Sequence, residues 1–220
     1  MLLKKSVLVI GGSGFIGSHL VDELIINNYK VTVLDIKKSK FSNSKANYVI
    51  SSTENTKKLS SNIKKNKIVY HLAGISDLNK AYKDPIGTAK KNILATVKIL
   101  DLCAKYKVDK FIFSSSIYVN SSSGGFYKSS KIACESYIEE FSKLYGIKYR
   151  ILRYGSVYGP RADQSNGIHL IIRDGLRKNK LVYNGSSRSI RKYIHVKDVA
   201  KISVKLLSNI YDNKYIDITG

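Results

Sequence analysis

The sequence predicts an α/β protein with a Rossmann-like, doubly wound parallel sheet. Three observations lead to this prediction. Strand-like apolar runs alternate with helical stretches along most of the 220 residues, which is typical of a parallel sheet with helices on both faces. The first run, residues 6–10, stops directly at a glycine-rich turn, as a strand buried on both faces does. An aspartate ends the next run, about 20 residues further on.

Each element follows from local pattern. Strands are expected where short apolar or β-branched runs end in turn residues, and helices where apolar residues recur every three or four positions. In the stretch 85–106, Ile93, Val97, Leu100 and Ala104 have this helical spacing. The expected strands cover 6–10, 30–35, 48–51, 67–73, 110–114, 148–153 and 215–218, and the expected helices about 14–26, 56–65, 85–106, 127–145, 168–178 and 196–208.

The composition favours a globular protein and argues against a nucleic-acid partner. Hydrophobic residues make up 43% of the chain, too many for disorder. The formal net charge is +22, but the lysines are spread along the whole chain, without a zinc finger, basic zipper or aromatic RNA-binding motif. We therefore expect no nucleic acid as partner. A basic surface would still attract a small anionic substrate.

Cysteine spacing and hydropathy exclude further classes. Cys103 and Cys134 lie in helical patterns without CxxC spacing, so neither a metal site nor a disulfide is expected. The longest apolar run is far too short to cross a bilayer. The first five residues lack the order of a signal peptide. We therefore expect a cytoplasmic protein without a membrane partner.

The glycine-rich turn after the first strand is a candidate phosphate site. Gly11, Gly14 and Gly17 have GxxGxxG spacing, with Phe15 and Ile16 between the last two. Glycine is needed because the tight turn and the close approach to a pyrophosphate leave no room for a β-carbon. The following helix N-terminus offers free N–H groups and a favourable dipole. A dinucleotide is the expected ligand.

Asp35, at the end of the second strand, is the candidate ribose ligand. Its carboxylate can accept a hydrogen bond from the ribose 2′-hydroxyl and would repel a 2′-phosphate. The cofactor is therefore expected to be NAD rather than NADP. Lys37 and Lys38 follow closely, and their positive charges weaken this discrimination.

Further motifs follow in order through nearly the whole chain. They are residues 11–17 (GGSGFIG), 71–74 (HLAG), Asn92 with Thr96, 111–116 (FIFSSS), 127–131 (YKSSK), 152–154 (LRY), 157–161 (VYGPR), 191–196 (RKYIHV) and Asp198. Taken together, these segments resemble the extended short-chain dehydrogenase/reductase family of NAD-dependent epimerases and dehydratases.

The resemblance implies a catalytic group of Ser116, Tyr127 and Lys131. Tyr127 and Lys131 lie four residues apart, so they share one helix face. Lys131 would lower the pKa of the Tyr127 phenol and bond the nicotinamide ribose, while Tyr127 exchanges the hydroxyl proton as hydride moves. Strand alignment selects Ser116 as the serine, whereas aligning Ile117–Tyr118 with the Val–Tyr pair of the family selects Ser114.

The resemblance also implies roles for residues outside this group. Leu72, Ala73 and Gly74 would line the cofactor. Asn92 would brace the fourth and fifth strands, and Tyr154 would sit beside the nicotinamide. Ser116, Ser156 and Arg191 would contact the substrate, Arg191 by gripping its pyrophosphate with a fixed cationic fork.

Departures from the family pattern narrow the expected reaction. Dehydratases carry an Asp–Glu pair after the catalytic residue, but here Ile117 and Tyr118 follow Ser116, so no acid is available to eliminate water. The segment 116–127 is short and rich in Gly and Ser, and Ser156 replaces an asparagine. We expect an NAD-dependent nucleotide-sugar epimerase similar to UDP-glucose/galactose 4-epimerase. A reductase of a keto sugar or small carbonyl, and a non-catalytic NAD-binding module, are the alternatives.

The expected organisation also follows the family. An NAD-binding Rossmann domain is expected over residues 1–160, and a partial substrate-binding lobe, interleaved with the same fold, over 161–220. The strand–helix alternation loosens at this point. This lobe is expected to be small and truncated relative to family members. A homodimer is expected because the helices near 85 and 127 correspond to those that pack as a four-helix bundle in the family.

Overall fold

The computed structural model describes residues 5–181 and 190–220 and contains a seven-stranded parallel sheet. The strand order is β3-β2-β1-β4-β5-β6-β9, so the order reverses between β1 and β4. This confirms the predicted doubly wound fold. The strands are β1 (Ser6–Ile10), β2 (Lys30–Asp35), β3 (Asn47–Ile50), β4 (Ile68–His71), β5 (Lys110–Ser116), β6 (Lys148–Tyr154) and β9 (Lys214–Ile218).

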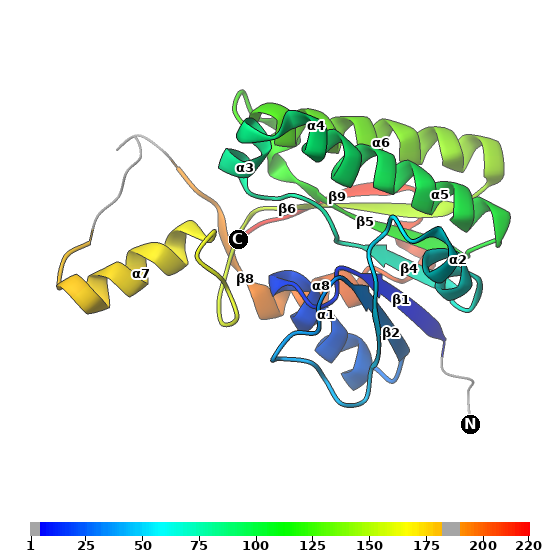
Figure 1. The fold of residues 1–220 in the computed structure, drawn as a ribbon, viewed down its shortest axis with the longest axis horizontal. Coiled ribbons are helices and arrows are strands. Elements are labelled where there is room, and N and C mark those ends of the chain that lie inside the picture. Colours follow the sequence, from blue (N-terminus) through cyan, green and yellow to red (C-terminus); the bar gives the residue numbers. More distant parts are fainter. Residues whose placement is uncertain (1–4, 182–189) are drawn as a thin grey trace.

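Helices cover both faces of this sheet (Figure 1). One layer holds α1 and α8, and the other holds α2, α5 and α6. The helices are α1 (Phe15–Ile26), α2 (Thr56–Lys64), α3 (Leu78–Lys83), α4 (Pro85–Thr88), α5 (Ala95–Lys105), α6 (Gly125–Tyr145), α7 (Gly167–Lys178) and α8 (Val196–Lys205). A π-helical segment, η1 (Ala89–Leu94), and two 3₁₀ turns, η2 (Ile117–Asn120) and η3 (Asn209–Tyr211), complete them.

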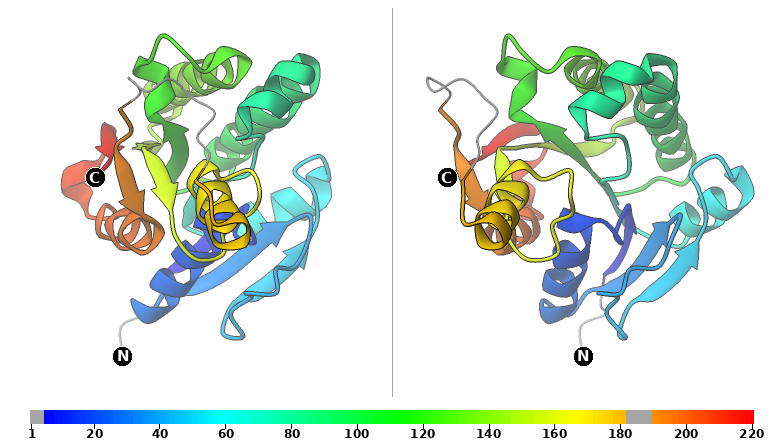
Figure 2. Two further views of the ribbon diagram at one scale, coloured as in Figure 1. Left: turned by 90° about the vertical axis from the view of Figure 1, so that its left-hand side faces the viewer. Right: turned by 60° about the vertical axis from the view of Figure 1, so that its left-hand side comes forward.

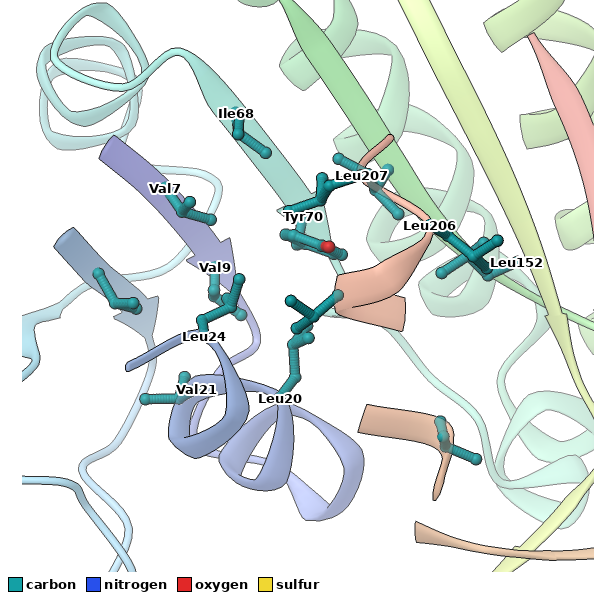
Figure 3. Packing of buried hydrophobic residues seen from close by; sticks show 14 of the residues in the cluster. Val7, Val9, Leu20, Val21, Leu24, Ile68, Tyr70, Leu152, Leu206 and Leu207 are labelled. Carbon is teal, nitrogen blue, oxygen red and sulfur yellow. The ribbon is translucent and has the colours of Figure 1, made fainter. Parts of the chain in front are cut away.

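Each face of the sheet has its own hydrophobic core. In β1, Val7 and Val9 pack toward α1 and α8, whereas Leu8 and Ile10 pack toward the α2/α5/α6 layer. Figure 3 shows the first core, where Leu20 and Leu24 of α1 lie against the central strands. All four β1 side chains are fully buried, which explains the unbroken apolar run in the sequence.

The structure differs from the predicted elements in several places. β5 continues to Ser116 because its three serines pair with Leu152–Tyr154 of β6, although serine ended the apolar pattern. The helix expected over 85–106 divides into α4, η1 and α5. α3 and the short pair β7 (Ser156–Tyr158) and β8 (Tyr193–His195) were not predicted.

The C-terminal part of the chain divides between two places. α8 packs against α1, and β9 extends the main sheet beside β6. In contrast, α7 projects from the body in Figure 1, is seen nearly end-on in Figure 2, and has no buried residue. The division at residue 160 into two domains stays a prediction. No helix in the described ranges is long and apolar enough to span a membrane.

Candidate active site

The predicted site residues gather at the carboxyl edge of the sheet. The turns after β1 and β4 meet there, at the point where the strand order reverses, and β5 and α6 lie beside them. Open α/β sheets bind ligands at this switch point. The fold therefore brings together segments that are far apart in the sequence.

The glycine-rich turn is tightly packed, and the helix that follows it has a free N-terminus. Gly11 has φ +87°, and a β-carbon there would lie 2.5 Å from the Ala73 nitrogen. A β-carbon at Gly17 would lie 2.2 Å from the Gly11 oxygen. Gly14 is exposed and caps α1 without a side-chain hydrogen bond. The first N–H groups of α1 are thus available to an anion.

Asp35 lies directly beside this turn. Its Oδ2 accepts from the Ser13 nitrogen at 3.0 Å and its Oδ1 from the Lys37 nitrogen at 3.4 Å. These bonds fix the carboxylate at the end of β2 and leave lone pairs for a ribose diol. Phe15 and Ile16 are partly buried in the first turn of α1. The arrangement fits the adenosine diphosphate half of NAD.

Asn92 fixes the turn that follows β4. Leu72 and Ala73 donate their backbone N–H groups to Ile10. Gly74 has φ +152°, and a β-carbon there would lie 2.7 Å from Asn92 Oδ1. Asn92 lies in the π segment and is 2% exposed. Asn92 therefore supports the turn that follows β4.

The hydrogen bonds of Asn92 show what it braces. Its Oδ1 accepts from the Ile75 nitrogen at 2.7 Å, and its Nδ2 donates to the Ile75 oxygen and to Ser130 Oγ. Asn92 therefore joins the turn after β4 to helix α6. The sequence leads us to expect that Asn92 braces the fourth and fifth strands. In the structure it instead joins the turn after β4 to α6.

Ser116, Tyr127 and Lys131 come together between β5 and α6. The Ser116 side chain faces the Tyr127 hydroxyl, and its Oγ accepts from the Tyr118 nitrogen at 3.3 Å. Lys131 Nζ donates to the Ser114 backbone oxygen at 2.7 Å and lies 5.8 Å from the centroid of the Tyr127 ring. The hydroxyl that contacts Tyr127 is thus that of Ser116, whereas Ser114 contributes its carbonyl oxygen.

Burial governs the ionisation of these groups. It raises the pKa of Tyr127 to about 12, while the neighbouring Ser116 hydroxyl acts in the opposite direction. Burial lowers the pKa of Lys131 to about 8. The expected lowering of the Tyr127 pKa by Lys131 is not seen in this arrangement, because burial dominates and Lys131 bonds a carbonyl.

Tyr118 contacts two of the predicted site residues, Tyr127 and Arg191. Its ring packs edge-on against Tyr127 with centroids 6.2 Å apart, and its hydroxyl accepts from Arg191 Nη1 at 3.1 Å. Arg191, predicted to bind pyrophosphate, is therefore linked to Tyr127 through one side chain. Ser156 starts β7 and pairs with Tyr193 in β8, two residues beyond Arg191.

Tyr154 lies differently from the expectation. It ends β6, but its side chain is 4% exposed and its hydroxyl bonds Ser203 Oγ of α8 at 2.9 Å. The hydroxyl thus points into the α1/α8 layer, away from α6. Its backbone at the carboxyl end of β6 is the part that remains near the site.

Sequence reasoning did not identify the residues that surround Ser116, Tyr127 and Lys131. Ile75 and Ala81 are buried against Tyr127, and Glu135 is buried one turn beyond Lys131. The four-residue spacing from Lys131 to Glu135 was the available signal. Ile75 and Ala81 come from a loop and a helix that no pattern predicted.

Comparison with known proteins decides the family. Residues 7–218 match the NAD dependent epimerase/dehydratase family. The chain belongs to this family. Membership confirms the resemblance drawn from the motifs, the prediction of an enzyme, and NAD as the cofactor. Within the described ranges, no group of three or more His, Cys, Asp or Glu side chains could hold a metal ion.

Several relatives of this family are similar over nearly the whole chain. The chain is 35% identical to "Putative UDP-glucose 4-epimerase" of Methanocaldococcus jannaschii, covering 96% of this chain and 76% of the relative. Its identity to a Dictyostelium discoideum dTDP-D-glucose 4,6-dehydratase is 28%, over 90% of this chain and 54% of the relative.

Solved structures of other proteins share the fold of this chain. UDP-glucose 4-epimerase of Thermotoga maritima with UDP-glucose gives a TM-score of 0.89 at 32% identity, over 97% of this chain and 76% of that one. UDP-glucuronic acid 4-epimerase of Bacillus cereus, in complex with UDP-glucuronic acid and NAD, gives a TM-score of 0.88 at 28% identity, over 98% of this chain and 77% of that one. This chain thus spans about three quarters of these relatives.

Proposed function

We propose that the protein is an NAD-dependent nucleotide-sugar 4-epimerase that interconverts UDP-glucose and UDP-galactose. The observation that carries this proposal is the contact of Tyr127 with Ser116, beside Lys131, at the sheet edge that carries the dinucleotide turn. The 32–35% identity to UDP-glucose 4-epimerases favours this reaction within the family.

The residues have separate roles in the proposed reaction. The Tyr127 phenolate removes the proton from the C4 hydroxyl of the sugar and later returns it, while Ser116 holds that oxygen by a hydrogen bond. The turn 11–17 and Asp35 would hold NAD, which would supply reversible hydride transfer at the sugar C4. Lys131 supplies positive charge that favours the phenolate when its ammonium turns toward the site.

A second set of residues holds the cofactor in this proposal. The turn Gly11–Gly17, including Gly14, Phe15 and Ile16, binds the pyrophosphate, and Asp35 binds the adenosine ribose. Residues 72–74 and the backbone at Tyr154 line the nicotinamide half. Asn92 keeps residues 72–74 in place through its bonds to Ile75.

The proposed substrate contacts are Ser116, Ser156 and Arg191. The planar guanidinium of Arg191 suits a diphosphate, and it already lies against Tyr118 beside the catalytic phenol. Ile117 and Tyr118 take the positions of the acidic pair of dehydratases, so water elimination lacks an acid there.

We further propose a cytoplasmic homodimer. Apolar side chains are exposed on the outer sides of η1 and α6, with Leu94 62%, Ile132 40%, Tyr137 45% and Leu144 73% exposed. A second copy of the same surface would cover them.

The first test is an assay of purified protein with UDP-glucose and UDP-galactose, with and without added NAD. We expect interconversion of the two sugars by NMR without net change at the absorbance of reduced nicotinamide. Net consumption of cofactor would show that the protein is a reductase and not an epimerase. Mass spectrometry of the products would reveal loss of water or carbon dioxide, which would contradict epimerisation. NAD binding without any turnover would indicate a non-catalytic NAD-binding module.

A further inference from the structure

A buried carboxylate on α6 lies outside the catalytic group proposed above. Glu135 is 5% exposed. Ser115 donates to its Oε1 at 2.5 Å, and Arg153 donates from Nε to Oε1 at 3.1 Å and from Nη2 to Oε2 at 2.7 Å. Both carboxylate oxygens thus have partners, and a buried charge bonded in this way has a fixed position.

The partners of Glu135 belong to adjacent strands. Ser115 lies on β5 and Arg153 on β6, and the Arg153 guanidinium lies over the ring of Tyr215 on β9, 4.5 Å from its centroid. β5, β6 and β9 are neighbours in the sheet. The contacts of Glu135 and Arg153 therefore connect α6 to the three strands β5, β6 and β9.

The same two elements carry the catalytic contacts. Tyr127, Lys131 and Glu135 follow one another at four-residue intervals along α6, so they share one helix face. Opposite this face lies the segment Ser114–Ser116 of β5. Lys131 donates to the carbonyl oxygen of Ser114, and Glu135 accepts from the hydroxyl of Ser115. Tyr127 faces the hydroxyl of Ser116.

We propose that Glu135 is a positioning residue, whose bonds to Ser115 and Arg153 hold α6 in register with β5 so that Tyr127 meets Ser116. This inference rests on the proposed function and deepens it. A shift of α6 by a fraction of an ångström would separate the phenol from the serine hydroxyl, because three successive contacts depend on one register.

Glu135 also contributes charge beside Lys131. The groups that face Lys131 are His71 of β4, Cys134 and Glu135 of α6, and the rings of Phe113 and Tyr127 at 4.6 and 5.8 Å. Glu135 raises the pKa of Lys131, against the larger lowering by burial. Removing the carboxylate would lower the pKa of Lys131 further.

A second buried ion pair offers a matched control. Arg150 lies on β6 like Arg153, is fully buried, and pairs with Asp212, which also contacts Lys110. This cluster lies at the amino end of the strands, away from the catalytic group. Asp212→Asn therefore weakens an ion pair of similar kind without changing the register of Tyr127.

The experiment compares wild type, Glu135→Gln, the double variant Glu135→Gln/Arg153→Gln, and Asp212→Asn as holoenzymes. We measure kcat and KM for UDP-glucose from pH 6 to 10, together with thermal unfolding. Glu135→Gln should lower kcat about tenfold or more with KM changed less than twofold, and should move the alkaline limb to lower pH. The double variant should regain thermal stability without regaining kcat.

Asp212→Asn should lose stability and keep both kcat and the pH profile. The proposal is overturned if the double variant recovers kcat to within threefold of wild type, or if Asp212→Asn moves the pH profile as Glu135→Gln does. If wild type does not turn over UDP-glucose, the proposed function fails separately. The decisive readout is then the chemical shift of the Tyr127 ring, followed by NMR of ¹³C-labelled tyrosine and assigned with Tyr127→Phe. An equal Tyr127 shift in wild type and Glu135→Gln overturns the inference.

Discussion

At the residue scale, the hydroxyl of Tyr127 is the atom on which turnover should depend. Tyr127→Phe removes this oxygen and keeps the ring, which packs against Ile75, Ala81 and Tyr118. We therefore expect a folded protein that retains NAD and loses about 10²–10⁴-fold in kcat. NMR of UDP-sugar interconversion and fluorescence titration with NAD measure the two properties.

Tyr70→Phe is the matched control for this prediction. The Tyr70 hydroxyl is also buried and donates to the Ser203 backbone oxygen at 2.8 Å, but in the α1/α8 layer. Its removal should cost about 1 kcal/mol of unfolding free energy and leave kcat unchanged. Equal turnover by Tyr127→Phe and wild type would remove Tyr127 from the mechanism.

Individual site residues differ in how far sequence could identify them. The spacing of Tyr127 and Lys131 is local to one helix, so it could be read directly. Tyr118 and Glu135 matter through contacts with Arg191 and Arg153, which lie 73 and 18 residues away. Such contacts depend on the folded sheet, and no local pattern reports them.

At the element scale, His71, the last residue of β4, should make the unfolding free energy of the protein depend on pH. His71 is 1% exposed, its Nε2 lies 3.0 Å from Thr96 Oγ1, and burial lowers its pKa to about 3. The unfolded chain binds a proton near pH 6.5 that the folded chain excludes, so stability falls as pH decreases from 6.5 toward 3. The loss at pH 4.5 is on the order of 2–3 kcal/mol.

Urea unfolding at pH 7 and pH 4.5 tests this expectation. His71→Gln should lose less stability between these two pH values than wild type does, because glutamine takes up no proton. His169→Gln, on the partly exposed surface of α7, should behave as wild type. If His71→Gln shows the wild-type decrease, the acid sensitivity arises elsewhere in the chain.

The elements that sequence predicted are those with a strong internal pattern. The strands β1 and β2, whose valine and leucine side chains are buried, start and end where the sequence predicted. β7 and β8 have three residues each and pair across more than thirty positions, so neither has a periodicity to read. The π segment around Asn92 depends on that side chain reaching Ile75 and Ser130, a tertiary contact.

At the scale of the whole molecule, the exposed side of η1 and α6 should form the proposed dimer interface. Wild type should sediment as a species of twice the chain mass of 24.6 kDa. Tyr137 is 45% exposed on α6, so Tyr137→Glu should fold and shift the species toward the monomer, because an unpaired carboxylate would be buried in the interface. Leu176→Glu on the projecting helix α7, where Leu176 is 84% exposed, is the control and should remain dimeric. A monomeric wild type, or a dimer equally stable in Tyr137→Glu, would show that this face stays open to solvent and that the site functions within a single chain.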